Sequence, residues 1–281
     1  WMSAATKAQA KDKLENFIIK IGYPDKWKDY SGLQVDDSLS LYENMANISE
    51  FFTKDAIARK VNKPVDKTEW GMTPQTINAY YNPTTNEICF PAAILQPPFF
   101  DPTADDAMNY GGIGGVIGHE MSHGFDDQGS QFDKTGNQHN WWTAADKKNF
   151  ESRTKILVDH FNKIELAGKK VNGQMTLGEN IGDNGGLNIA FRALQNVMKT
   201  EKLGVKDGFT PEQRFFLAWA RVWAGNARPE YLQYLMTVDV HSPNEARVNG
   251  ALPMVDSWYK AFNIKKGDKL FVPKNKRAHI W

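Results

Sequence analysis

One segment, residues 105–124, limits the fold more than any other part of the sequence. Its apolar residues follow helical spacing, yet five glycines interrupt it before its final Gly124, at positions 111, 112, 114, 115 and 118. Each glycine costs a helix about 1 kcal/mol relative to alanine. A helix that keeps five of them is expected to pack closely against other backbone or to line a tight site. A phosphate-binding loop is disfavoured, because Ile117 stands where the dinucleotide pattern needs glycine and no Gly-Lys-Ser/Thr follows.

The same segment ends in a pentapeptide that suits a zinc ion, His119-Glu120-Met121-Ser122-His123. Residues four apart share one face of a helix, so both imidazoles can reach one ion at about 2.0–2.1 Å. Glu120 lies about 100° round the helix from His119, beside the metal rather than on it. There it can take a proton from a metal-bound water. Two surface histidines and a solvated glutamate are the less favoured interpretation, because the chain holds only 6 histidines.

A catalytic zinc needs a third protein ligand and an open fourth position. Glu179 and Asp183 are candidates, since they stand four residues apart on a helix expected from Thr176 to about Met198. The residues from Thr176 to Glu179 also match a capping box, which would explain Glu179 without any metal. The residues alone leave both interpretations open. Asp183 is suited to hold the imidazole of a ligand histidine in the required tautomer.

The remaining pattern is mostly helical, with one short hairpin. Further helices are expected over residues 3–21, from Leu41 to Phe52, and after the start signals at Thr143, Thr210 and Ser242. Strands are expected at 76–81 and 87–90, joined by the turn residues 82–86. Residues 62–68 are polar, contain a proline and suit a domain boundary. The fold class predicted is therefore α+β, mostly helical.

Composition narrows the classes of function. The 281 residues include 34 Lys and Arg against 33 Asp and Glu, and no basic stripe is present, so a nucleic-acid binder is disfavoured. No run of 18 apolar residues exists, which argues against a membrane span in this chain. Cys89 is the single cysteine, so an intramolecular disulfide is excluded.

Four stretches in the same order resemble the neprilysin family of zinc endopeptidases, which includes the endothelin-converting enzymes and bacterial oligopeptidase O. These stretches are Asn78-Ala79-Tyr80-Tyr81, Val116 to Asp127, Gly178 to Gly186, and Asp239-Val240-His241-Ser242-Pro243. The resemblance runs from Trp1 to Trp281 and corresponds to roughly the carboxyl-terminal half of a family member. It implies a thermolysin-like zinc-metallopeptidase catalytic domain over residues 63–281. Residues 1–62 would then be a helical segment of a lid lobe that is otherwise missing.

The resemblance also implies roles for single residues. His119, His123 and Glu179 would bind one zinc ion per chain, and Glu120 would be the general base. Asp183 would support a ligand histidine, with His119 favoured. The substrate-facing residues implied are His241 at the oxyanion, Arg247 at a substrate carbonyl, Asn78 and Ala79 along the substrate backbone, and Ile94, Phe99, Val116, Val222 and Trp223 in the pocket just past the scissile bond.

The function expected on this basis is zinc-dependent endopeptidase action on short peptides, on the amino side of hydrophobic residues, through a zinc-bound water activated by Glu120. The alternative is a non-catalytic half that holds zinc and serves as a binding or regulatory module. Expected partners are oligopeptide substrates and the missing amino-terminal half of the same protein. The chain ends in residues 278–281, Ala-His-Ile-Trp, without the Cys-x-x-Trp common in the family. This favours a bacterial-type member. The compartment expected is the periplasm, the cell envelope or the exterior, with the cytoplasm as the alternative.

Overall fold

The computed structural model describes residues 1–281, which form two compact units. Unit 1 consists of Trp1–Gly22 and Gln75–Trp281, and unit 2 is Tyr23–Pro74. This division differs from the expected boundary between residues 62 and 63, because the first 22 residues cluster with the long carboxyl-terminal segment. No helix in the chain combines the length and the apolar character that a bilayer crossing needs.

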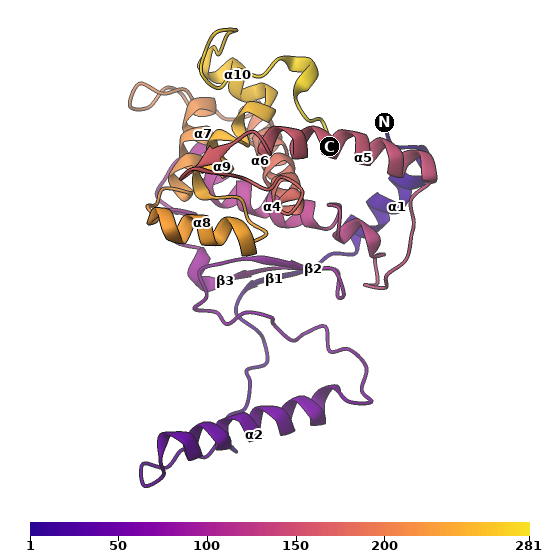
Figure 1. Cartoon of the computed structure of the whole chain (residues 1–281), viewed down its shortest axis with the longest axis vertical. Coiled ribbons are helices and arrows are strands. Elements are labelled where there is room, and N and C mark those ends of the chain that lie inside the picture. The colour runs from indigo at the N-terminus through magenta and orange to yellow at the C-terminus, as the bar shows by residue number, and fades with distance from the viewer. The chain divides into compact units, whose positions relative to one another are not determined.

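Unit 1 is a helical body with a small sheet along one side (Figure 1). Its helices are α1 (Ala4–Glu15), α3 (Asp106–Asn109), α4 (Gly115–His123), α5 (Ala144–Phe161), α6 (Leu177–Val197), α7 (Pro211–Val222), α8 (Pro229–Val238), α9 (Asn244–Asn249) and α10 (Asp256–Phe262). The three-stranded sheet has the order β1 (Ile18–Gly22), β3 (Glu87–Pro91), β2 (Tyr80–Asn82). A separate two-stranded ladder joins β4 (Glu165–Leu166) to β5 (Lys169–Lys170).

The first helix is shorter than its apolar spacing predicts. Helix α1 ends at Glu15, and Ile18–Gly22 instead forms strand β1, which pairs in parallel with β3. Three isoleucines in this run explain the difference, because β-branched side chains favour extended backbone. The strand also buries an ion pair with β3, since Lys20 Nζ lies 2.7 Å from Glu87 Oε2. The prediction of a helix over residues 3–21 is therefore wrong beyond residue 15.

The predicted hairpin is confirmed, with a shorter first strand. Strand β2 runs antiparallel to β3, and Tyr80 lies opposite Cys89. Because β1 occupies the other side of β3, β2 is an edge strand of the sheet. Asn78 is exposed two residues before β2, while Ala79 is buried.

The close packing expected from the glycines of residues 105–124 is confirmed. Helices α4 and α6 lie against each other, and a Cβ on Gly118 would lie 2.8 Å from the Cα of Gly186. The segment is not one regular helix, however. A π-helical turn, Tyr110–Gly114, separates α3 from α4. Such turns are rare and recur near functional sites.

The core of unit 1 consists of three apolar clusters that hold α4 and α6 from different sides. Trp219 and Phe215 of α7 join α6 to α10 in the first cluster, and Leu157 of α5 contributes to the second. The third cluster lies between the sheet and α4 and includes Phe90 and Val116. The two helices therefore meet inside a packed frame, which limits how far their side chains can shift.

Most helix starts agree with the sequence pattern. Thr143 caps α5, and Thr210 opens α7 with a full capping box. Ser242 was also expected to cap a helix, but α9 begins after Pro243 and no side chain caps it. Ser242 Oγ instead donates a hydrogen bond to Asn180 Oδ1 of α6 at 2.7 Å.

Unit 2 contains a single helix, α2 (Leu41–Lys60), which extends the predicted stripe of Leu41 to Phe52. Ser40 and Glu43 form a capping box at its start, and none of its residues is buried. Asp55 forms an ion pair with Arg59 on the same helix and another with Lys28, which ties the helix to the segment before it.

Candidate metal centre

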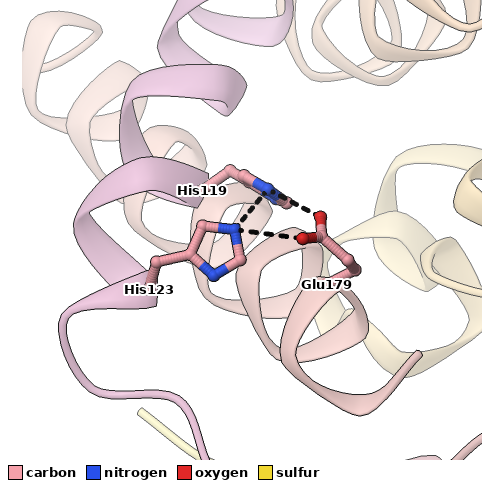
Figure 2. A group of neighbouring side chains, drawn as sticks. All are labelled: His119, His123 and Glu179. Atoms are coloured by element: carbon pink, nitrogen blue, oxygen red, sulfur yellow. Dashed lines mark hydrogen bonds and ion pairs between the residues drawn. The ribbon is translucent and has the colours of Figure 1, made fainter. Parts of the chain in front are cut away.

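Three polar side chains from α4 and α6 converge on one point (Figure 2). His119 and His123 stand one turn apart on α4, and their Nε2 atoms lie 2.9 Å from each other. Glu179, in the first turn of α6, faces both rings. Its Oε2 lies 3.2 Å from His119 Nε2, and its Oε1 lies 3.6 Å from His123 Nε2.

These distances suit a single zinc ion. Four ligands at about 2.1 Å in a tetrahedron lie roughly 3.4 Å from one another. The three separations between His119, His123 and Glu179 scatter around that value, and all ligand atoms lie within 4.8 Å of one another. The Oε2 atom of Glu179 is also buried without a hydrogen-bond partner, which a bound cation would satisfy. The residues present therefore fit the metal that the sequence predicts.

The alternative explanation of Glu179 as part of a capping box is wrong. Thr176 stands at the start of α6 but makes no capping hydrogen bond to the helix. Its hydroxyl donates to Asn172 O at 3.0 Å and accepts from Asn180 Nδ2 at 2.9 Å. Glu179 therefore lies in the first turn for a reason other than helix initiation.

The ring of His119 is oriented by a buried carboxylate on α6. Its Nδ1 lies 2.9 Å from Asp183 Oδ1. Asp183 is in turn bound by the guanidinium of Arg247, with Nε 2.9 Å from Oδ2 and Nη2 2.6 Å from Oδ1. A carboxylate at Nδ1 fixes the tautomer that leaves Nε2 free to bind metal.

The ring of His123 is oriented by a different carboxylate, which the sequence analysis missed. Asp126 Oδ2 lies 2.6 Å from His123 Nδ1. The other oxygen, Oδ1, accepts hydrogen bonds from the backbone N–H of Gln128 at 2.8 Å and of Gly129 at 2.7 Å. The only signal in the sequence is an acidic residue three positions after the histidine, where the helix has just ended.

Without metal, the charged side chains of this site stabilise one another in their ionised forms. Burial by itself lowers the pKa of His119, but its hydrogen bond to Asp183 and its ion pair with Glu179 outweigh burial and raise that pKa to about 10. Burial opposes ionisation of Glu179, and its ion pair with His119 nevertheless holds the pKa of its carboxyl well below the usual range. A metal cation would replace these protons, because histidine binds metal in its neutral form.

Glu120 has a different environment from the ligand carboxylate. It is buried, and burial raises the pKa of its carboxyl, while the charges of His119 and His123 act against that rise. A carboxylate with a raised pKa accepts a proton more readily near neutral pH. Glu120 therefore has the character of a base rather than of a permanent anion.

Two of the expected substrate-facing residues lie beside the ligands. His241 is half exposed, with Nε2 3.4 Å from Glu179 Oε2 and Nδ1 2.7 Å from Asp239 Oδ1. Arg247 is buried, and its guanidinium carbon lies 3.9 Å from the centre of the Trp223 ring. Asp239 is a further residue that the sequence analysis left without a role.

The expected pocket residues fall into two groups. Ile94 and Val116 belong to the cluster between the sheet and α4, which also holds Ala79 from the expected backbone contacts, and Phe99 packs against it half buried. Trp223 packs instead against the cluster around α7, and Val222 is the last residue of that helix. The structure thus brings the first four together, and Trp223 reaches the metal centre through Arg247.

Known proteins resemble this chain along its whole length. The sequence profile described as peptidase family M13 matches residues 78–278. A neutral endopeptidase of Lactobacillus helveticus is 40% identical over 282 residues, which cover 100% of this chain and 42% of that protein. Endothelin-converting enzyme 1 of Rattus norvegicus is 38% identical over 290 residues, covering 100% of this chain and 38% of that protein.

A solved structure is also similar to this chain over its whole length. The crystal structure of Mycobacterium tuberculosis zinc metalloprotease ZMP1 in complex with inhibitor matches with a TM-score of 0.96 and 47% identity, covering 100% of this chain and 44% of that one. The chain thus spans about two fifths of the length of the relatives it matches. With a matching family profile over most of its length, the chain belongs to peptidase family M13, the neprilysin and endothelin-converting enzyme family.

Proposed function

We propose that this chain is the zinc-binding catalytic part of a metalloendopeptidase that cleaves short peptides on the amino side of hydrophobic residues. The observation that carries the proposal is the triangle of His119, His123 and Glu179, with separations that suit one zinc ion. Beside it lies a buried carboxyl, Glu120, that is not part of the triangle. A purely structural zinc site has no use for a base at that position.

Each residue of the centre has a task in such a reaction. Zinc, when bound, lowers the pKa of a water to about 7 and polarises the carbonyl of a substrate. His119, His123 and Glu179 would hold the ion. Glu120 takes a proton from the attacking water and delivers it to the leaving amine, which is the usual exchange of general base and general acid. His241 would donate to the oxygen on which negative charge develops.

The edge of the sheet is suited to bind the substrate backbone. Strand β2 is an edge strand, so an extended peptide can add to the sheet by main-chain hydrogen bonds, with Asn78 and Ala79 as its anchors. Arg247 uses Nε and Nη2 on Asp183, whereas its Nη1 makes no hydrogen bond within the chain. We assign that Nη1 to a carbonyl of the substrate.

The preference for a hydrophobic residue rests on the side chains around α4. Ile94, Phe99 and Val116 lie in one apolar cluster beside the metal-binding helix. They would form the pocket just past the scissile bond, with Val222 and Trp223 as further lining. A hydrophobic side chain gains about 25 cal/mol per Å² buried there, which sets a preference rather than a strict requirement.

The related proteins are longer than this chain. The expected partner of this chain is the amino-terminal half that those proteins also contain. Unit 2 overlaps the expected lid segment over residues 23–62, and its helix has no buried residue, which suits packing against further chain. Remote contacts to a substrate raise the rate of the chemical step as well as affinity. We therefore expect this chain alone to bind zinc and to cleave peptides weakly, and to gain activity when the amino-terminal half is supplied.

The decisive experiment separates the base from the ligands. Glu120→Gln should keep stoichiometric zinc and lose about 10²–10⁴ in cleavage rate, since only the proton acceptor is gone. His123→Ala and Glu179→Ala should lose the zinc itself. Metal analysis and cleavage of a fluorogenic peptide, with and without chelator, measure both effects.

Glu201→Gln, at an exposed position after α6, is the matched control and should change neither quantity. Full activity in Glu120→Gln would overturn the assignment of the base. Zinc binding without any cleavage, even with the amino-terminal half present, would instead favour the non-catalytic module.

A further inference from the structure

A buried ammonium group lies next to the metal centre but outside every role assigned so far. Lys13 of α1 is only 1% exposed. Its Nζ donates three hydrogen bonds of 2.7 Å each, to the backbone carbonyls of Gly124, Gly129 and Phe132. The rings of Tyr81 and Phe125 lie 5.7 and 5.6 Å from the same atom. Three carbonyls and two aromatic faces make a site for one monovalent cation.

The three carbonyls belong to one irregular segment, the 124–132 loop, which follows His123 directly. Carbonyl oxygens that point at one another inside a protein repel unless a cation lies between them. Burial lowers the pKa of Lys13 to about 8, with Asp126 and Asp133 acting in the opposite direction, so the ammonium form prevails at pH 7. Lys13 therefore keeps this loop closed on itself.

The loop that Lys13 closes also carries the support of a zinc ligand. Gly129 accepts from Lys13 through its carbonyl, and its N–H donates to Asp126 Oδ1 at 2.7 Å. The other oxygen of Asp126 lies 2.6 Å from His123 Nδ1. A short chain of contacts thus leads from Lys13 through Gly129 and Asp126 to the metal-binding ring.

We propose that Lys13 is a positioning residue of the zinc centre: its ammonium closes the 124–132 loop so that Asp126 holds His123 in its metal-binding orientation. The inference rests on the proposed zinc function. It assigns a role to a residue outside the family match at 78–278.

Attachment of α1 does not depend on this ammonium alone. Asn86 Nδ2 donates to the backbone carbonyls of Lys13 at 3.1 Å and Asn16 at 3.2 Å. At the other end of the helix, Asp146 Oδ2 accepts from Thr6 Oγ1 at 2.6 Å. Removing the ammonium should therefore leave α1 in place and open the loop, which separates the proposed role from a general one in folding.

The test measures zinc affinity rather than activity. Lys13→Met keeps the length of the side chain and removes the charge, and should weaken zinc binding about 10–100-fold in competition with a chromophoric chelator, the usual range for a lost supporting contact. The visible spectrum of the cobalt-substituted protein should change as well, because the geometry at His123 is altered. Lys11→Met is the matched control, since Lys11 lies on the same helix with its side chain 74% exposed.

A rescue experiment makes the test specific. Lys13→Ala removes the atoms of n-propylammonium, so this ion should restore zinc affinity to that variant, whereas tetramethylammonium at the same ionic strength should not. Combining Lys13→Met with Asp126→Asn should weaken zinc binding by less than the product of the two single effects, because both act through one contact.

The possible results separate the inference from the proposed function. Wild-type protein that fails to bind zinc would overturn the function itself. Wild-type zinc affinity in Lys13→Met would overturn only the positioning role. Loss of the cooperative thermal transition of the metal-free Lys13→Met protein would also overturn it, because Lys13 would then serve the whole fold.

Discussion

The two zinc-ligand histidines stand one turn apart, yet they are supported in different ways. His119 is held by Asp183, a fully buried residue of α6 that is 64 positions away and paired with Arg247. His123 is held by Asp126, three positions away in the 124–132 loop and bound mainly by backbone N–H groups. One support is part of the helical core, and the other is a loop held closed by hydrogen bonds.

The difference teaches which part of the centre is tied to folding. A Cβ on Gly182 would lie 2.7 Å from Cε1 of His119, so α6 touches that ring directly as well as through Asp183. On the loop side, α1 contributes one side chain, Lys13, which binds the backbone carbonyls of the loop and does not touch the His123 ring itself. We therefore expect damage at Asp183 to affect stability and metal together, and damage at Asp126 to affect mainly the metal.

The largest expected effect is that of Asp183→Asn. It leaves the charge of Arg247 buried without its partner, and breaking a buried ion pair costs about 3–5 kcal/mol. It also removes the acceptor for His119, so zinc affinity should fall by about 10–100-fold. Thermal unfolding of the metal-free protein and chelator competition measure the two effects.

The control for this change is Asp159→Asn, because Asp159 is an exposed ion-pair partner on α5. The control should alter neither stability nor zinc affinity, since an exposed pair contributes at most about 1 kcal/mol. If Asp183→Asn were as stable as the wild type, the buried pair with Arg247 would not tie this histidine to the core.

A smaller effect is expected for Asp126→Asn. The amide oxygen can still accept the backbone N–H groups of Gln128 and Gly129, so the loop should persist. The amide nitrogen would then face Nδ1 of His123, which in the metal-bound ring is itself a donor. We expect zinc affinity to fall about tenfold, with little change in the melting temperature of the metal-free protein. A loss of stability equal to that of Asp183→Asn would erase the contrast between the two supports.

Local spacing was enough to predict the parts of the centre that lie within one or two helical turns. His119 and His123 are four apart, and so are Glu179 and Asp183, which places each pair on one helix face. The glycines predicted close packing, because a helix keeps so many only where another backbone approaches. The competing explanation of Glu179 could be rejected only from the structure, which shows that Thr176 does not cap α6.

Contacts between segments that are distant along the chain left no comparable pattern in the sequence. Lys13 meets the 124–132 loop across more than 100 residues of chain, and a single lysine on an amphipathic helix looks like any solvated one. Strand β1 was mistaken for helix, because Ile18 and Ile21 are three residues apart and fit helical spacing, while the pairing partner β3 lies far along the chain. The division into two compact units could not be read from the sequence either, because residues 1–22 join unit 1 through contacts with segments far along the chain.

The smallest expected effect is a change of stability with pH that differs between the metal-free and zinc-loaded protein. In the metal-free protein the pKa of His119 is raised from 6.5 to about 10, with Asp183 as the first of the groups that raise it. The charged ring therefore adds stability that is complete below pH 6.5 and declines as pH rises towards 10. The range from pH 6.5 to 8 is the one to measure. Above pH 8, Lys13, with its pKa lowered to about 8, makes stability rise with pH and so opposes the effect of His119.

Zinc reverses this dependence. Bound histidines are neutral, so protons compete with the metal less and less as pH rises, and zinc affinity increases. Between pH 6.5 and 8 the melting temperature of the metal-free protein should fall by a few degrees relative to that of the zinc-loaded protein. Scanning calorimetry with and without chelator measures this gap. Asp183→Asn should reduce this fall in the melting temperature of the metal-free protein. Asp126→Asn should keep the share of the fall that comes from His119. A metal-free protein whose melting temperature rises over this range would show that Asp183 does not hold a proton on His119.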